Sequence, residues 1–218
     1  IIEEFSVREG VRINTVYNGC GILTGTMRTM KRDQQSGFPD VYMACDVYYL
    51  DTVKDWFQND VSISETPIVM VVKKGNPKEI RALADLAKPK RKIGICSEDH
   101  SALGFLSQRL LEKHKLQQAV QKNIADSPAT ADVLVTQVVA GALDAAIVYK
   151  ANTSRRVKDL AIISIDDPLA NAVQPIAVAD KSDFSQLSKR LMDKINSEEA
   201  KQRFEELGFR WLGEAQKK

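Results

Sequence analysis

Segments typical of β-strands alternate with segments typical of α-helices along almost the whole chain. The strongest strand pattern is the apolar run 66–72, TPIVMVV, which suits a strand buried on both faces. Other segments carry apolar residues at helical spacing, as in the stripe of Leu103, Leu106 and Leu110. This alternation predicts an α/β fold in which mostly parallel sheets are flanked by helices.

Two apolar segments divide the chain of 218 residues into blocks. Residues 66–72 and 171–179 bracket a middle block, and a helix over 79–87 is predicted soon after the first of them. We therefore expect two lobes, the first made of residues 1–67 plus 175–218 and the second of 68–174. In open parallel sheets ligands bind beyond the C-terminal strand ends, so two such lobes facing each other would form a binding cleft.

A strand, a tight glycine turn and a helix are predicted near the start of the chain. Residues 11–17 look like a strand, Asn18-Gly19-Cys20-Gly21 like the turn, and a helix to about residue 32 follows. Such a turn directs N–H groups and the positive end of the helix dipole beyond the strand, which makes a cradle for an anion. The same pattern also suits a simple strand-to-helix connection.

The first residues, 1–9, look like the end of a helix that Gly10 stops. A domain that begins inside a helix is unusual, so we expect a preceding strand to be missing from this chain.

The charge balance and the composition exclude several classes of protein. The chain has 31 basic and 29 acidic residues, which is not the footprint of a nucleic-acid binder. No apolar run approaches the length of a membrane span, and none at the start looks like a signal peptide. With only two histidines and no zinc spacing, no metal or cofactor is predicted.

The three cysteines, Cys20, Cys45 and Cys96, each fall at or just after the end of a predicted strand. They could converge to bind a soft metal, since thiolates suit such ions. Cys20 and Cys45 could instead form a disulfide, or each cysteine could be a small buried filler. The sequence leaves these three alternatives open.

Five segments of the chain follow one another in an order typical of a known family. They are residues 5–13, 18–23 (NGCGIL), 40–46 (DVYMACD), 71–77 (VVKKGNP) and 141–149 (GALDAAIVY). With these segments the chain resembles the type II periplasmic solute-binding proteins of ABC importers, closest to the molybdate- and tungstate-binding group and its uncharacterised relatives. The resemblance runs through nearly the whole chain.

The resemblance implies a two-lobed, non-enzymatic protein that holds a small oxyanion with hydroxyls and backbone N–H groups, without counter-charged side chains. Cys20 stands where the family usually has an anion-binding serine, and Tyr149 matches its hydroxyl donor. The implied ligand-binding residues are Asn18, Gly19, Cys20, Gly21 and Cys45 in the first lobe, with Ser101, Ala102, Ala131, Asp132 and Tyr149 in the second.

The family also implies a location and partners. We expect a monomer in the periplasm or outside the cell, with a leader that this chain does not include and a lipid anchor as one option. Its partners would be a small oxyanion and the membrane permease of an ABC importer, with no nucleic acid and no insertion into the membrane.

One loop departs from the family pattern. The family's D-P-x-x-x-P-A-G loop is here residues 97–104, which adds Glu98, Asp99 and His100 near the predicted cleft. Carboxylates there would repel a dianion unless they point away. Two alternatives therefore stay open: an enzyme on the same fold that uses these three residues as acid and base, and a ligand-sensing domain of a larger protein.

Overall fold

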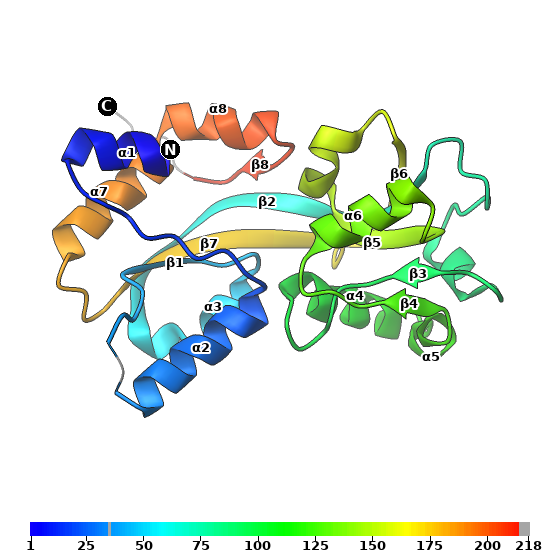
Figure 1. The fold of residues 1–218 in the computed structure, drawn as a ribbon, viewed down its shortest axis with the longest axis horizontal. Helices are drawn as coiled ribbons and strands as arrows, with labels where there is room; N and C mark the ends of the chain where they lie inside the picture. Colours follow the sequence, from blue (N-terminus) through cyan, green and yellow to red (C-terminus); the bar gives the residue numbers. More distant parts are fainter. Residues whose placement is uncertain (35, 214–218) are drawn as a thin grey trace. The chain divides into compact units, whose positions relative to one another are not determined.

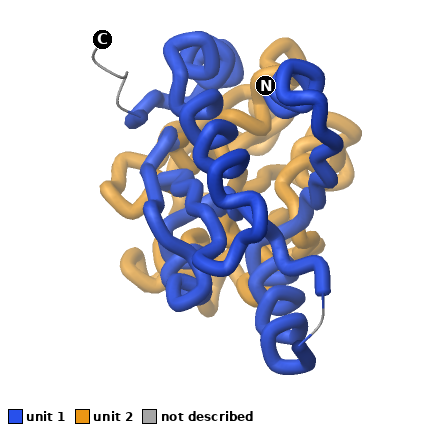
Figure 2. The backbone as a smooth tube through the Cα atoms, turned by 90° about the vertical axis from the view of Figure 1, so that its left-hand side faces the viewer, with its two compact units in different colours: residues 1–65, 173–218 blue, residues 66–172 orange. Residues whose placement is uncertain are grey.

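The chain passes twice between two units, through the strands β2 (Phe57–Lys73) and β7 (Asn171–Ala179) (Figure 2). The computed structural model describes residues 1–34 and 36–213. Unit 1 takes residues 1–65 and the chain from 173 onward, and unit 2 takes residues 66–172. Each unit has its own core, so each is described separately.

Unit 1 combines short strands with helices on either side of them (Figure 1). Its helices are α1 (Ile2–Glu9), α2 (Cys20–Arg32), α3 (Val47–Asp51), the 3₁₀ turn η1 (Lys54–Trp56), α7 (Ser185–Ile195) and α8 (Glu198–Glu206). Strand β1 (Val41–Met43) pairs antiparallel with β7, and β8 (Arg210–Trp211) pairs antiparallel with β2. The core of this unit contains Phe5, Ile63, Ile176, Val178, Leu191, Met192 and Ile195.

The ends of several helices in unit 1 follow from single residues. Gly10 ends α1 in the left-handed conformation at φ 67°, where glycine carries no Cβ penalty. The Asp46 carboxylate accepts the N–H of Tyr48 at 3.1 Å and so caps α3. The helix stop predicted at Gly10 is confirmed.

The predicted strand over residues 11–17 is wrong. No secondary structure forms there, and the side chains of Val16 and Tyr17 are 75% and 83% exposed. A strand needs a neighbour with which to exchange backbone hydrogen bonds, and no strand among the described residues pairs with this segment. An alternating pattern is therefore insufficient where no partner edge is present.

Unit 2 is an α/β unit built on the middle of the chain. Its strands are β3 (Ile93–Gly94), β4 (Ile124–Asp126), β5 (Ala145–Tyr149) and β6 (Leu160–Ser164), together with the second half of β2. Its helices are α4 (Ala102–Lys113), α5 (Gln117–Gln121) and α6 (Ala131–Ala140), with the 3₁₀ turns η2 (Leu83–Ala87) and η3 (Lys150–Arg156). Helices α4 and α6 both contact β5 (Figure 1).

The sheet of unit 2 is mixed. Strand β3 lies between β4 and β5 and runs parallel to both. Strand β2 pairs antiparallel with β5, with Ile68 opposite Tyr149, and antiparallel with β6. The strands joined by helical crossovers are thus parallel, as predicted, while the crossing strand β2 enters in the opposite direction.

The helix predicted over residues 79–87 is reduced to the 3₁₀ turn η2. The side chain of Asn76 bonds both the N–H and the carbonyl of Ile80, and Asp85 accepts the N–H groups of Arg81 and Ala82. Side chains that bond nearby backbone in this way compete with helix formation.

Within the described part of the chain, no helix is long and apolar enough to cross a membrane.

Asp167 ties the end of α4 to the segment before β7, and we expect this contact to make unit 2 sensitive to acid. Its carboxylate lies 2.8 Å from Lys113 Nζ and 2.8 Å from His114 Nε2, and it accepts the N–H of Leu169. The hydrogen bond from Lys113, followed by that from Leu169, lowers the pKa of Asp167 to about 2. Since an unfolded aspartate titrates near pH 4, roughly, this stabilisation is full above that pH and is lost as the pH falls toward 2.

Urea unfolding at pH 6, 4 and 2.5 tests this expectation in Asp167→Asn. The variant should be less stable than wild type at pH 6 and should lose less of its stability on acidification. The exposed neighbour Asp166, as Asp166→Asn, is the matched control and should follow the wild-type profile. Parallel profiles for wild type and Asp167→Asn would contradict the assignment.

Candidate ligand-binding site

The turn Asn18–Gly21 sets the start of α2 in unit 1. Gly19 is the N-cap residue, at φ −57° and ψ 138°, and its carbonyl accepts the N–H of Leu23 at 3.1 Å. The N–H of Gly19 itself donates to Asn18 Oδ1 at 2.9 Å. The N–H groups of residues 20–22 have no acceptor among the described residues, as is usual in a first helical turn. These three donors at the positive end of the helix make an arrangement that can bind an anion.

The sulfur of Cys20 is held by several hydrogen-bond donors. Cys20 is the first residue of α2 and is 1% exposed. The N–H of Cys45 donates to its Sγ at 3.2 Å, and the side chain of Cys45 also hydrogen-bonds to it. Cys45 is held in turn, because its carbonyl accepts the side-chain amide of Gln174 at 3.1 Å.

These contacts change the acidity of Cys20. The hydrogen bonds from the Cys45 side chain and the Cys45 N–H lower the pKa of Cys20 to about 7 against the opposing effect of burial. Burial and the nearby thiolate raise the pKa of Tyr42, so its hydroxyl stays protonated. Near neutral pH, the start of α2 therefore carries a partly ionised sulfur.

In unit 2, the predicted residues lie along one edge of the sheet. Because β3, β4 and β5 are parallel, their C-terminal ends share this edge. The N–H of Ser97, after β3, donates to the carbonyl of Pro128, after β4, at 2.9 Å, and the N–H of Ser101 donates to the Ser97 carbonyl at 3.0 Å. Tyr149 is the last residue of β5.

Helices α4 and α6 both begin next to this edge. Their N-cap residues, Ser101 and Thr130, make no side-chain cap. The N–H groups of residues 102–104 and 131–133 have no acceptor within the described chain. The starts of α4 and α6 therefore offer two further sets of neutral donors.

Cys96 differs from Cys20 in its acidity. It is 2% exposed, and burial raises its pKa to about 12 despite a hydrogen bond with the side chain of Ser101. It therefore stays a neutral thiol at neutral pH. All three cysteines are free, and across residues 1–34 and 36–213 no group of three His, Cys, Asp or Glu side chains could hold a metal ion. The structure thus gives the predicted soft-metal alternative no ligand set.

Carboxylates stand close to some of these donors. Asp132 is an exposed residue in the first turn of α6 and accepts the side-chain amide of Asn152 at 3.1 Å. Its charge favours the helix start but competes with an anion there. Residues 98–100 form an exposed turn, with His100 Nδ1 3.3 Å from Ser97 Oγ. The starts of α2 and α4, which have no acidic residue in their first turns, are the better anion sites.

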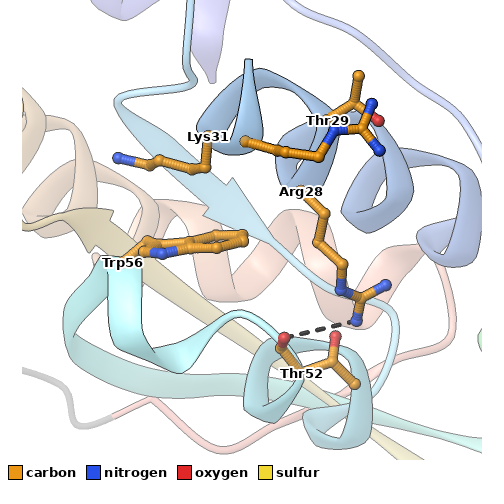
Figure 3. A pocket seen from close by; sticks show the side chains of 6 residues that line it. Arg28, Thr29, Lys31, Thr52 and Trp56 are labelled. Atoms are coloured by element: carbon orange, nitrogen blue, oxygen red, sulfur yellow. Dashed lines mark hydrogen bonds between the residues drawn. The ribbon is translucent and has the colours of Figure 1, made fainter. Parts of the chain in front are cut away.

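A separate pocket of about 580 Å³ lies near the other end of α2 (Figure 3). It is lined by Arg28, Thr29, Lys31, Arg32, Thr52 and Trp56. Arg28 donates to the carbonyl of Thr52 at 3.4 Å, Lys31 lies 3.9 Å from the centroid of the Phe38 ring, and Arg32 pairs with Asp33. Because this pocket is cationic, a binding experiment with anions must be able to distinguish it from the helix starts.

Comparisons with known proteins show the same architecture. The sequence pattern of the family described as bacterial extracellular solute-binding protein matches residues 1–210. The chain belongs to this family. Its fold and the sequence-based resemblance to the type II group are thereby confirmed. No curated protein sequence matches this solute-binding protein.

Three solved structures illustrate the similarity in fold. The periplasmic molybdate-binding protein of Azotobacter vinelandii is 13% identical, with a TM-score of 0.77 over 95% of this chain and 90% of that one. The sulfate-binding protein SubI of Mycobacterium tuberculosis H37Rv is 20% identical, with a TM-score of 0.73 over 97% and 81%. The periplasmic binding protein AfuA of Actinobacillus pleuropneumoniae, with fructose-6-phosphate bound, is 12% identical, with a TM-score of 0.78 over 99% and 82%.

Each unit brings together some of the residues that the sequence suggests for this solute-binding protein. In unit 1, Cys45 reaches the turn 18–21 through Cys20. In unit 2, the starts of α4 and α6 and the end of β5 lie at one sheet edge. Tyr42, a buried residue of β1 beside this pair, was not among the residues that the sequence suggested.

Proposed function

We propose that this solute-binding protein binds a small tetrahedral oxyanion, of the molybdate or tungstate kind. The observation that carries the proposal is the set of open N–H groups at the starts of α2 and α4, with no Asp, Glu, Lys or Arg in either first turn. Neutral donors that are fixed in place suit a small dianion, because they hold its charge without rearranging.

The known ligands of similar folds support the same class. The three similar structures are of proteins described as binding molybdate, sulfate and fructose-6-phosphate, which all present tetrahedral oxyanion groups. The family places the protein outside the cytoplasmic membrane, and we propose that it acts there as a monomer and delivers its ligand to the permease of an ABC importer. We propose no catalytic role, because Glu98, Asp99 and His100 lie in an exposed turn, where the contact of His100 with Ser97 is open to water.

Titration calorimetry with molybdate, tungstate, sulfate and phosphate tests the proposal. Ala131→Pro and Ala102→Pro each remove one N–H at the first position of a helix, where proline fits the backbone. The loss of one hydrogen bond to a charged group costs roughly 1.5–3 kcal/mol, so affinity should fall about 10- to 100-fold in Ala102→Pro. A smaller loss is expected in Ala131→Pro, because Asp132 already opposes an anion at α6.

Two matched controls make the result specific. Glu198→Pro removes the equivalent N–H at the exposed start of α8 and should bind as wild type does. Arg28→Ala alters the cationic pocket and should also leave binding unchanged. Anion binding that is lost in Arg28→Ala but kept in Ala102→Pro would move the site to that pocket, and heat from none of the four anions would reject the proposal. Turnover of a small substrate that is lost in His100→Ala would instead support an enzyme.

A further inference from the structure

The two cysteines of unit 1 form a side-chain pair that oxyanion binding does not explain. Cys20 and Cys45 are 25 residues apart in the sequence, and their side chains hydrogen-bond to each other. The N–H of Cys45 also points at the Cys20 sulfur from 3.2 Å, so the backbone that carries one sulfur lies directly beside the other sulfur. Disulfide formation requires this kind of proximity between two cysteines.

The two sulfurs differ in access and in environment. Cys20 is buried at the start of α2 and receives hydrogen bonds that favour its thiolate. Cys45 is partly exposed, so a small reagent in solution can reach it. Cys45 can thus react with a reagent in solution, and Cys20 lies beside it as the second nucleophile. Thiol–disulfide exchange requires this arrangement.

We propose that Cys20 and Cys45 are a reversible dithiol–disulfide site, oxidised by a small disulfide of the glutathione type. Cys45 attacks one sulfur of the reagent as its thiol proton leaves, which gives a mixed disulfide, and the released reagent thiolate takes up a proton. The Cys20 thiolate then attacks Cys45 Sγ, forms the Cys20–Cys45 bond and releases the second reagent thiol. The protein loses two electrons and two protons, and the disulfide reagent gains them as two thiols.

Closing this bond changes the start of α2. The disulfide removes the ionisable sulfur from the first residue of α2. It also joins α2 covalently to Cys45, which lies two residues after the end of β1 (Val41–Met43). The proposal does not depend on the identity of the ligand, since the chemistry involves only these two cysteines and the reagent.

Thiol counting on the folded protein tests the proposal without any anion present. The full chain is incubated with mixtures of oxidised and reduced glutathione, quenched with acid, alkylated and weighed intact. Wild type has three cysteines, and oxidation should remove two alkylation sites without retaining glutathione, while added dithiothreitol should restore all three. Peptide mapping should find Cys20 joined to Cys45.

Single variants separate the two steps. Cys96→Ser should lose both of its remaining thiols as wild type does, because that cysteine lies in unit 2. Cys20→Ser should instead accumulate glutathione on Cys45, since the second nucleophile is gone. Circular dichroism confirms that each variant is folded. Three intact thiols in oxidised wild type, stable glutathionylation of Cys45 in wild type, or a bond that forms only in urea would each overturn the proposal.

Discussion

Replacing Gly104 with alanine should strongly destabilise unit 2. Gly104 is the third residue of α4, and a Cβ placed on it would lie 2.1 Å from the Ser97 carbonyl oxygen and 2.5 Å from that of Cys96. Both obstacles are backbone atoms, which cannot rotate away as a side chain can. We expect the free energy of unfolding to fall by about 3 kcal/mol, because overpacking of this kind outweighs the gain of roughly 1 kcal/mol that alanine brings to a helix.

The close approach at Gly104 also serves the candidate site. It lets α4 begin directly against the turn after β3, where the N–H of Ser101 meets the Ser97 carbonyl. A methyl group would push this helix start away, so oxyanion affinity should fall together with stability. Urea unfolding followed by circular dichroism measures the first effect, and calorimetry at a temperature where the variant stays folded measures the second.

Gly25 provides the matched control. It lies inside α2, and a Cβ there would meet nothing within 4 Å. Gly25→Ala should therefore stabilise unit 1 by roughly 0.5–1 kcal/mol through helix propensity alone. Wild-type stability in Gly104→Ala would show that α4 can shift at no cost.

Local sequence signals were enough to predict many elements of this fold. The start of α2 follows from Gly19 and the helical spacing after it, and β7 was predicted with its observed bounds because most of its residues are apolar. The caps at Gly10 and Asp46 depend on backbone and side-chain geometry within a few residues. Such features depend on a few neighbouring residues, so a sequence pattern can predict them.

Features that depend on distant partners were missed or misjudged. Residues 11–17 have the alternation of a strand, but no strand among the described residues pairs with them. The first half of β2 is polar on its exposed face and forms because Ser64 and Glu65 pair with β8, near the other end of the chain. The sequence pattern of one segment does not reveal whether another segment pairs with it in a sheet.

In the candidate site, too, local features were predicted from the sequence and features that depend on distant contacts were not. The turn 18–21 was found because its glycines and its helix start are adjacent in the sequence. The contact between Cys20, Cys45 and Tyr42 requires the packing of β1 against α2, so the sequence could offer a Cys20–Cys45 bond only as one of three alternatives. The low pKa of Cys20 follows from that packing and was not predicted.

Oxyanion affinity should fall as the pH rises through about 7, provided that the cysteines are kept reduced. Below this pH Cys20 is a neutral thiol, and above it a thiolate stands at the start of α2, because hydrogen bonds from Cys45 lower its pKa to about 7. Two unit charges about 4 Å apart interact by roughly 4 kcal/mol at an effective dielectric constant near 20, so the thiolate form should bind a dianion poorly. A single group with a pKa of about 7 goes from about one-tenth to about nine-tenths ionised between pH 6 and pH 8, so a dianion should bind up to about tenfold more weakly at pH 8 than at pH 6.

Sulfate and molybdate are the probes for this experiment, because phosphate changes its own charge near neutral pH. Cys20→Ser should bind with little dependence on pH and more tightly than wild type at pH 8, since a hydroxyl donates without ionising. Cys96→Ser should keep the wild-type profile. By linkage, wild type should also take up protons when the anion binds at pH 7.5, because the ligand's charge raises the pKa of Cys20, and calorimetry in buffers of different ionisation enthalpy measures this uptake. A flat affinity profile without proton uptake would mean that the ligand does not lie beside this sulfur, and would move the site away from the start of α2.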